Sequence, residues 1–222
     1  MNMKRIILLA LCLVWGGWIL AGCSGGEPFA QKDYTADGER IAEIRIDVRD
    51  RRIEVARASD NQIHIAYYES GKEYYDISIS DGNVLTMSAA VNKDWTDYIG
   101  AKPAAGCRKI SLQVPDGLLT ALRLSTTNED ISLPTLTVLE DIELSSTGGN
   151  ILFDQLGAGN TIALRAKNGN ISGAILGSCD EYAVSCKVKK GESNLPSEKA
   201  GGEKTLAITN NNGDVDITFA GE

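Results

Sequence analysis

The chain has few of the residues on which common enzyme chemistries depend. Its 222 residues include one histidine, His64, so an imidazole base is available at a single position. His64 alternates with Ile63 and Ile65, and this spacing predicts an outward-facing strand residue with no identifiable Ser or Cys partner. The cysteines form no Cys-x-x-Cys pair, and no phosphate-cradling loop occurs. We therefore predict a protein without a metal site, cofactor or catalytic residue.

Basic residues are also in the minority. Lys and Arg total 22 against 30 Asp and Glu, which gives a formal net charge of −8 at pH 7. Nucleic acids and anionic lipid surfaces are bound through clustered Lys and Arg. The two small basic groups of the chain, at 49–52 and 187–190, are interleaved with acidic or apolar residues. This pattern predicts solvated strand faces and no nucleic-acid partner.

Long apolar runs are absent after the first twenty residues. Lys4-Arg5, an apolar stretch from Ile6 to Leu20 and small residues before Cys23 have the order of a secretory signal. An uncleaved membrane anchor is the alternative, but the stretch is shorter than the roughly 20 residues that span a bilayer. Leu20-Ala21-Gly22-Cys23 resembles the bacterial lipobox, whose cysteine carries a diacylglycerol. The resemblance implies a lipoprotein signal peptide, a helix over 1–22, and lipidation of Cys23. It also implies a lipid anchor in the bacterial cell membrane or outer membrane, with the protein facing outside the cytoplasm.

Three cysteines remain after Cys12 in the signal and Cys23 at the lipid site, namely Cys107, Cys179 and Cys186. An odd number allows at most one disulfide within the chain. An oxidising compartment permits Cys179–Cys186 or a bridge to Cys107. Free cysteine is also a common small core residue, so the sequence leaves the disulfide open.

A repeat of about twenty residues runs through the second half of the chain. Four apolar columns recur at this interval: Leu122, Ile142, Ile162; Leu124, Leu144, Leu164; Ile131, Ile151, Ile171; and Leu136, Leu156, Leu176. Within a copy the apolar spacing is two, then seven, then two. Steps of two indicate strands, and the odd step requires a turn between them. The turn segments 128–130, 148–150 and 168–170 contain the Asn, Gly and Asp residues that favour tight turns. Each copy is predicted to be two short strands joined at a corner.

Related spacing occurs outside the regular copies. It is found in the groups Ile44, Ile46, Ile53, Val55 and Leu206, Ile208, Val215, Ile217, and more loosely in Ile77, Ile79, Leu85, Met87. Tyr182 and Val184 lie twenty residues after Ile162 and Leu164. We therefore predict one domain over 41–219, with an N-terminal β section (41–88), an irregular connection (89–109) and regular repeats (110–219). Residues 23–40 lack apolar periodicity and are predicted to be a flexible tether.

Two architectures suit the repeat. In a parallel β-solenoid each copy is one coil, whereas in an antiparallel meander each turn closes a hairpin. Identical columns favour the solenoid, because each copy buries its apolar face only against its neighbours. The predicted fold class is all-β, a right-handed parallel β-solenoid or β-helix-like domain with repeats of about 20 residues.

The C-terminal third of the chain carries a more specific signature. It contains Lys189-Lys190-Gly191, Ser193-Asn194-Leu195-Pro196, Gly201-Gly202, Lys204 and Asn211-Asn212-Gly213-Asp214. With the Asn-Gly corners, these segments resemble the bacterial domain family named "putative adhesin", which has no established function. The resemblance covers residues 40–219. It implies a β-helix-like envelope protein, secreted or membrane-tethered and sometimes linked to envelope stress, and it carries over no catalytic or ligand-binding residue. The first corner, 127–130, departs from the family pattern because it lacks the usual glycine.

Carboxylate pairs are the main alternative, because many β-helix proteins cleave polysaccharides. The candidates are Asp130, Glu140, Asp141, Glu143, Asp154, Asp214 and Asp216. Glycoside hydrolysis needs two carboxyl groups about 5–10 Å apart in a groove, whereas these residues are expected at corners or on outward strand positions. Calcium is a further option at 210–216, where the sequence faintly resembles calcium-binding corners of other solenoids. Asn150 and Asn170 occupy the matching positions, and turn geometry explains them without metal.

The sequence thus predicts a non-enzymatic, lipid-anchored envelope protein that acts in adhesion, scaffolding or envelope-stress signalling through a flat strand face and the corners. The alternative function is a polysaccharide-active lyase or hydrolase of the β-helix type. The expected partners are the membrane, through the N-terminal lipid, and a glycan or an envelope protein.

Overall fold

The computed structural model describes residues 28–91 and 103–221. The predicted signal helix and Cys23 lie outside these residues. The described residues are all-β apart from three short 3-10 turns at 38–40, 105–107 and 179–181. None of the helical segments in this part of the chain is long and apolar enough to cross a membrane.

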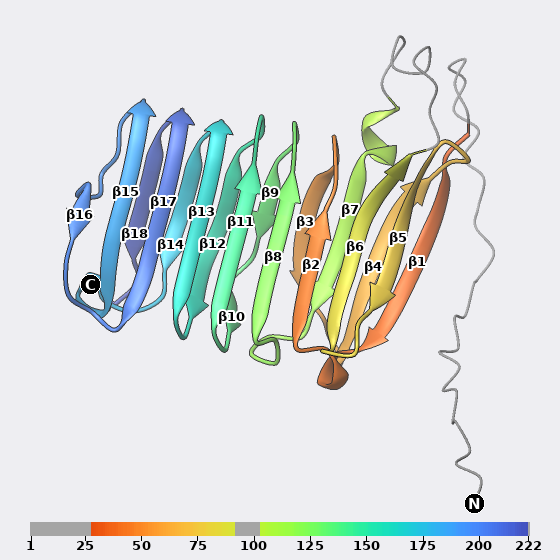
Figure 1. The fold of residues 1–222 in the computed structure, drawn as a ribbon, viewed down its shortest axis with the longest axis horizontal. Coiled ribbons are helices and arrows are strands. Elements are labelled where there is room, and N and C mark those ends of the chain that lie inside the picture. The colour runs from red at the N-terminus through yellow and green to blue at the C-terminus, as the bar shows by residue number, and fades with distance from the viewer. Residues whose placement is uncertain (1–27, 92–102, 222) are drawn as a thin grey trace, which may run out of the picture.

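The strands form two sheets that pack face to face along one long axis (Figure 1). Sheet A contains, in spatial order, β1 (Ala30–Asp37), β4 (Gln62–Glu69), β7 (Lys109–Val114), β3 (Arg52–Arg57), β9 (Ile131–Leu133), β12 (Ile151–Ala158), β14 (Ile171–Ile175) and β18 (Val215–Phe219), with β10 (Leu136–Val138) beside β12. Sheet B contains β16 (Glu198–Lys199), β15 (Tyr182–Lys190), β17 (Lys204–Asn212), β13 (Thr161–Asn168), β11 (Asp141–Ser146), β8 (Ala121–Thr126), β2 (Glu43–Asp47), β6 (Val84–Val91) and β5 (Glu73–Ile79). Most neighbouring strands are parallel, so the arrangement is β-solenoid-like.

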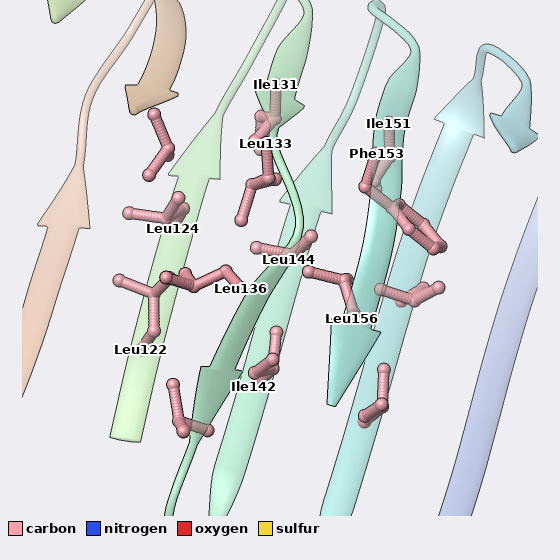
Figure 2. Close-up of a cluster of buried hydrophobic side chains, with 14 of the residues drawn as sticks. Leu122, Leu124, Ile131, Leu133, Leu136, Ile142, Leu144, Ile151, Phe153 and Leu156 are labelled. Atoms are coloured by element: carbon pink, nitrogen blue, oxygen red, sulfur yellow. The ribbon is translucent and has the colours of Figure 1, made fainter. Parts of the chain in front are cut away.

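Three of the four predicted apolar columns are ladders of paired residues throughout. In the fourth, Leu136 pairs with Leu156, but Leu156 pairs with Ile175 in place of the predicted Leu176, because the register of β12 against β14 shifts. Leu122 of β8 pairs with Ile142 of β11, which pairs with Ile162 of β13. The columns through Leu124 and Ile131 align in the same way. Their side chains are buried, and Figure 2 shows them pointing from both sheets into the space between them. The core is therefore a continuous apolar layer, and each corner between two strands moves the chain from one sheet to the other.

The corners are held by a ladder of Asn and Asp side chains. The backbone N–H of Asn150 donates to Oδ1 of Asp130 at 2.7 Å, and that of Asn170 donates to Oδ1 of Asn150 at 2.8 Å. The glycines of the second and third corners allow close stacking, because a Cβ on Gly149 would lie 2.1 Å from the carbonyl oxygen of Glu129 and one on Gly169 would lie 2.2 Å from that of Gly149. The Asn-Gly pattern is thus explained by backbone contacts between successive corners.

Strand order departs from chain order near the C-terminus. The twenty-residue spacing predicts Tyr182 beside Ile162, but β17 lies between β13 and β15. Ile162 therefore pairs with Leu206, and Leu206 pairs with Val184. The last coil in the sequence is inserted inside the stack, and β15 is displaced outward.

The corner ladder provides a physical reason for this insertion. Lys190 lies twenty residues after Asn170 and has no hydrogen-bond acceptor in its side chain. Asp214 fits the ladder on both sides: its N–H donates to Oδ1 of Asn170 at 2.9 Å, and its Oδ1 accepts from the N–H of Glu192 at 2.9 Å. An acceptor side chain continues the ladder where a lysine would end it.

The tether prediction is wrong from residue 30 onward. β1 pairs antiparallel with β4 along its whole length. The alternate, less exposed positions of β1 are Ala30, Lys32, Tyr34 and Ala36. This series has too little apolar character to signal a strand, and pairing with β4 stabilises it instead.

The interpretation of residues 77–87 as a corner is also wrong. β5 and β6 form an antiparallel hairpin in which Ile77 pairs with Met87 and Ile79 with Leu85. Leu85 and Met87 are fully buried, whereas Ile79 is 46% exposed because β5 is the last described strand of sheet B. β6 also continues to Val91, inside the segment predicted to be irregular. By contrast, the spacing at 44–53 is confirmed as a coil, since Ile44 pairs with Leu122.

Candidate functional site

The outer faces of the two sheets are the broad surfaces that the fold leaves accessible. On sheet B, charged residues of alternating sign cross β2, β8, β11 and β13. Glu43 accepts hydrogen bonds from Nε of Arg45 and Nε of Arg123, each at 2.6 Å. Glu143 accepts from Nη1 of Arg123 at 2.9 Å and from Arg165. We call these five residues the charge ladder.

Every charged group of the charge ladder is paired within the ladder. The hydrogen bond from Arg45 is the largest effect on the pKa of Glu43, which is lowered although partial burial opposes the change; Arg123 lowers it further. The pKa of Arg123 is raised by its hydrogen bond to Glu43 and, after a smaller opposing effect of burial, by Glu143. These pairs stabilise neighbouring strands, as cross-strand pairs do on any sheet.

At one end of sheet A, β1, β4 and β7 lie side by side (Figure 1). The outer face of the sheet is hollowed there. Asp33 pairs with Ala66, and Ala66 pairs with Ser111. These short side chains form the floor of an open depression of about 260 Å³. Thr35, His64 and Gln113 pair in the same way and form one wall. We call this depression the first hollow.

His64 is held between two partners in this wall. Its Nδ1 lies 3.3 Å from Oγ1 of Thr35, and its Nε2 lies 3.0 Å from Oδ1 of Asp60. The hydrogen bond from His64 is the main cause that lowers the pKa of Asp60, followed by the backbone N–H of Gln62. The predicted outward orientation of His64 is confirmed, because Ile63 and Ile65 are buried and the imidazole is 35% exposed. Its two partners fix the orientation of the ring.

A second hollow of about 230 Å³ lies further along the same face. It is lined by Ser132, Leu152, Asp154 and Ser172, from β9, β12 and β14. Here the register of β12 against β14 shifts after Leu152, which marks a β-bulge. Leu152 is 38% exposed on this outer face. The depression forms because the bulge displaces the strand locally and the side chains of Ser132 and Ser172 are too small to fill the space.

The carboxylates of the enzymatic alternative are distributed over different parts of the molecule. Asp130 and Asp214 belong to the corner ladder, and Asp216 accepts from Nδ2 of Asn194 at 3.1 Å. Glu143 belongs to the charge ladder. The remaining three are Asp141 at the start of β11, Glu140 just before it, and Asp154 in the second hollow. The fold does not bring these residues together around one groove.

The residues considered for calcium and for disulfides have other roles in the structure. Asp214 joins the corner ladder through hydrogen bonds, and no group of three His, Cys, Asp or Glu side chains suited to a metal occurs within 28–91 and 103–221. Within the described residues, Cys107, Cys179 and Cys186 form no disulfide bond. The buried Sγ of Cys186 lies 3.3 Å from Oγ of Ser193.

Sequence reasoning missed the first hollow. Asp33 and Thr35 fall in the segment predicted to be a tether, and Ala66 meets Ser111 only through antiparallel pairing of distant strands. The available signal was the alternation of polar Gln31, Asp33 and Thr35 with the less exposed positions between them.

Comparison with known families agrees with this architecture. The family model described as Toastrack DUF4097 matches residues 41–222. The chain belongs to the Toastrack DUF4097 family. β1, which covers one end of sheet A and supplies Asp33 and Thr35, precedes the matched residues of the Toastrack domain.

One solved structure supports the same overall fold at low sequence identity. A "putative cell adhesion protein" from Clostridium sporogenes is similar to this Toastrack chain with a TM-score of 0.55 and 8% identity, over 85% of this chain and 98% of that one. A "putative adhesin" from Bacteroides fragilis has a TM-score of 0.37 and 12% identity, over 89% of this chain and 100% of that one. At 8% identity, the likeness to the Clostridium protein concerns the fold alone. The search of curated proteins found no match.

Proposed function

We propose that this Toastrack protein is a lipid-anchored, non-enzymatic protein of the bacterial envelope that binds a partner through the outer face of sheet A, in adhesion or scaffolding. One observation carries the proposal. Within the described residues, the side chains of Asp33, Ser111 and Gln113 at the first hollow have no hydrogen-bond or ion-pair partner, whereas the charged groups of the charge ladder on the opposite face are paired with one another. Polar groups that are exposed and unengaged are available to a ligand.

The anchoring part of the proposal depends on the sequence of the first 23 residues. Leu20-Ala21-Gly22 before Cys23 supports cleavage and lipidation at that cysteine. Two or three acyl chains anchor a protein stably, because each buried methylene contributes about 0.8 kcal/mol. A surface location outside the cytoplasm follows from such an anchor.

The non-enzymatic part is supported by the engagement of the candidate carboxylates. Asp130, Asp214 and Asp216 accept hydrogen bonds that hold corners and the C-terminal segment. A carboxylate that accepts structural hydrogen bonds is poorly suited to exchange a proton with a substrate in acid or base catalysis. The finer form of the fold, a right-handed coil with a period of about twenty residues, also belongs to the proposal. The twenty-residue register of β8, β11 and β13 supports that period.

Labelling with radioactive palmitate tests the anchor. Cells that produce the wild-type chain are expected to incorporate label into the protein and retain it in the membrane fraction. Cys23→Ala is expected to lose the label and the membrane retention, and Cys12→Ala, in the signal segment, serves as the matched control. Label that persists in Cys23→Ala would refute lipidation at this residue.

Cell attachment tests the binding role. Cells that carry the anchored double variant Asp33→Ala/Gln113→Ala are expected to attach less to their natural surface or matrix than cells with the wild-type chain. Thr209→Ala, an exposed change on the outer face of sheet B, is the control and is expected to attach normally. Equal attachment of the double variant and the wild type would exclude the first hollow from adhesion.

A further inference from the structure

We infer that the two hollows on the outer face of sheet A form one site for an extended, neutral glycan that lies across the strands. This inference rests on the proposed binding role of that face and names the chemical class of its partner. It is carried by the register of the strands, the free polar groups in both hollows and the charge of the surface between them.

The floor of the site is a single row of paired residues. The row runs across six strands through Ala66, Ser111, Glu54, Ser132, Leu152 and Ser172, with Asp33 at its outer end. Ala66 and Ser111 thus line the first hollow and Ser132 and Ser172 line the second, and Glu54 and Leu152 are the longer side chains of the row. Adjacent strands are about 4.8 Å apart. This spacing is close to the length that one sugar residue adds to an extended chain, so consecutive sugars can each meet one strand.

The first hollow has one polar wall, and a tyrosine of the same face lies beyond the residues that line it. One wall is the row of Thr35, His64 and Gln113. On the other side of the floor, Tyr68 of β4 pairs with Gln31 of β1, and its hydroxyl donates to Oε1 of Gln31 at 3.2 Å. This hydrogen bond holds the ring of Tyr68 in place. A tyrosine ring offers an apolar face with a polar tip, which is the combination that stacks on the C–H face of a sugar while leaving its hydroxyls accessible.

Both hollows contain free hydrogen-bonding groups. In the first hollow these are the carboxylate of Asp33, the hydroxyl of Ser111 and the amide of Gln113; none has a side-chain partner among the described residues. In the second hollow Ser132 and Asp154 are equally free within the same part of the chain. Carboxylate and amide oxygens accept from hydroxyls, and the serine hydroxyl and the amide NH₂ donate to them. Sugar hydroxyls require both kinds of partner.

The charges of the row favour a neutral ligand. Glu54 lies on the single strand between the two hollows, and it is paired with Arg52 at 3.7 Å and with Lys109. Two cations share the one carboxylate of Glu54, so these pairs leave a single positive charge at the centre of the site, which does not outweigh the two carboxylates of the hollows. The free charges that remain within the described part of the two hollows are the carboxylates of Asp33 and Asp154. An acidic polysaccharide would be repelled by both, whereas an uncharged glycan would not.

Because the hollows are shallow, we expect one protein molecule to bind a glycan weakly. Open sites leave much of a ligand in water, so the gain per sugar is small compared with the cost of ordering the chain. Many copies anchored on one cell surface would bind a polymer with much higher avidity. This behaviour suits an adhesion role.

Equilibrium binding of fluorescently labelled cellohexaose and chitohexaose to the full chain tests the inference. The protein is kept in a detergent without sugar head groups, and polygalacturonate is the acidic comparison. We expect at least one neutral oligosaccharide to bind with a dissociation constant tighter than about 1 mM. We expect polygalacturonate to bind at least tenfold more weakly than that oligosaccharide.

Two matched substitutions locate the site. Ser111→Gln places a longer side chain on the floor of the first hollow, and Ser145→Gln makes the same change on the outer face of sheet B. Both serines are half-buried outer-face residues, so both variants are expected to keep the wild-type unfolding temperature. Ser111→Gln is expected to weaken neutral-glycan binding at least tenfold, and Ser145→Gln to leave it unchanged.

Three results would overturn the inference. They are binding of neither neutral oligosaccharide at 1 mM or below, preferential binding of polygalacturonate, or equal binding by Ser111→Gln and the wild type. None of these results bears on palmitate labelling of Cys23 or on cell attachment, so the proposed function and the glycan site fail separately.

Discussion

The two ends of the sandwich each lack a neighbouring coil, and they are covered by different means. At the N-terminal end the antiparallel pairs β1–β4 and β5–β6 extend the two sheets. At the C-terminal end the segment 191–199 lies against β18 and β15. In Figure 1 the two ends lie at opposite limits of the long axis. The comparison shows how a repeated apolar core can be closed by chemically different caps.

The N-terminal end encloses a charge. Arg51 is 4% exposed; its Nη2 lies 2.5 Å from Oε2 of Glu73, and its Nε donates to the hydroxyl of Tyr75 at 2.7 Å. Burial alone would lower the pKa of Arg51, but Tyr75 and Glu73 outweigh it and raise the pKa. The ring of Tyr67 meets that of Tyr75 edge-on at 5.3 Å. This end therefore combines aromatic packing with a buried ion pair.

The C-terminal end uses a neutral amide. Asn194 accepts from the N–H of Ile217 at 3.0 Å and donates to its carbonyl oxygen at 2.8 Å. One side chain thereby satisfies both backbone groups that a further strand would pair with. Leu195 then packs against the core. Neutral hydrogen bonds of this kind contribute less than a buried charge costs when it loses its partner.

The largest effect in this comparison is expected from Glu73→Ala. It leaves the guanidinium of Arg51 buried with one partner fewer and should destabilise the protein by about 3–5 kcal/mol. Urea unfolding of the single variant and of Arg51→Met/Glu73→Leu measures this cost, because the double variant removes both charges and should recover most of the loss. A single variant as stable as the wild type would contradict a role for the ion pair.

The next effect concerns the opposite end. Asn194→Ala removes both hydrogen bonds to Ile217 and should cost about 2 kcal/mol. Asn194→Asp keeps the acceptor and loses the donor, so its unfolding free energy should lie between those of the wild type and the alanine variant. If Asn194→Ala costs as much as Glu73→Ala, the distinction between a neutral and a charged cap is lost.

A substitution between the two ends should have a smaller effect. Asn170→Ala removes the acceptor for the N–H of Asp214 and should destabilise by about 1 kcal/mol. Lys167→Ala, at an exposed position near the end of β13 whose side chain makes no hydrogen bond or ion pair among the described residues, is the comparison and is expected to cost less. Thermal unfolding of both variants measures the difference, and equal midpoints would remove the corner ladder as a cause of the strand order.

The smallest effect is a dependence on pH at the charge ladder. The pKa of Glu43 is lowered in the folded protein, chiefly by Arg45, so its contribution is present above the ordinary carboxyl pKa and is lost as the pH falls through the lowered one. Glu43→Gln should therefore flatten the acidic part of the curve of unfolding free energy against pH. If Glu43→Gln and the wild type have the same dependence of unfolding free energy on pH in the acidic range, the pairing of Glu43 with Arg45 contributes nothing to stability.

Much of the fold, and less of the candidate site, could be predicted from the sequence. The columns through Leu122 and Leu124 were recognisable because alternation and turn residues are local properties. The orientation of His64 was recognisable for the same reason. The first hollow was not, because its floor joins Asp33, Ala66 and Ser111 from strands whose adjacency depends on antiparallel pairing across the N-terminal end.

For the regular repeats, the sequence by itself determined which residues face the core, where the chain turns and that coils stack on one another. Only the tertiary structure decided which coils are neighbours. An apolar column is satisfied by any partner of the same spacing, so Ile162 can pair with Tyr182 or with Leu206 equally well by that criterion. The choice of Leu206 depends on the acceptor at Asp214 and on closure of both ends, which are non-local contacts that form together.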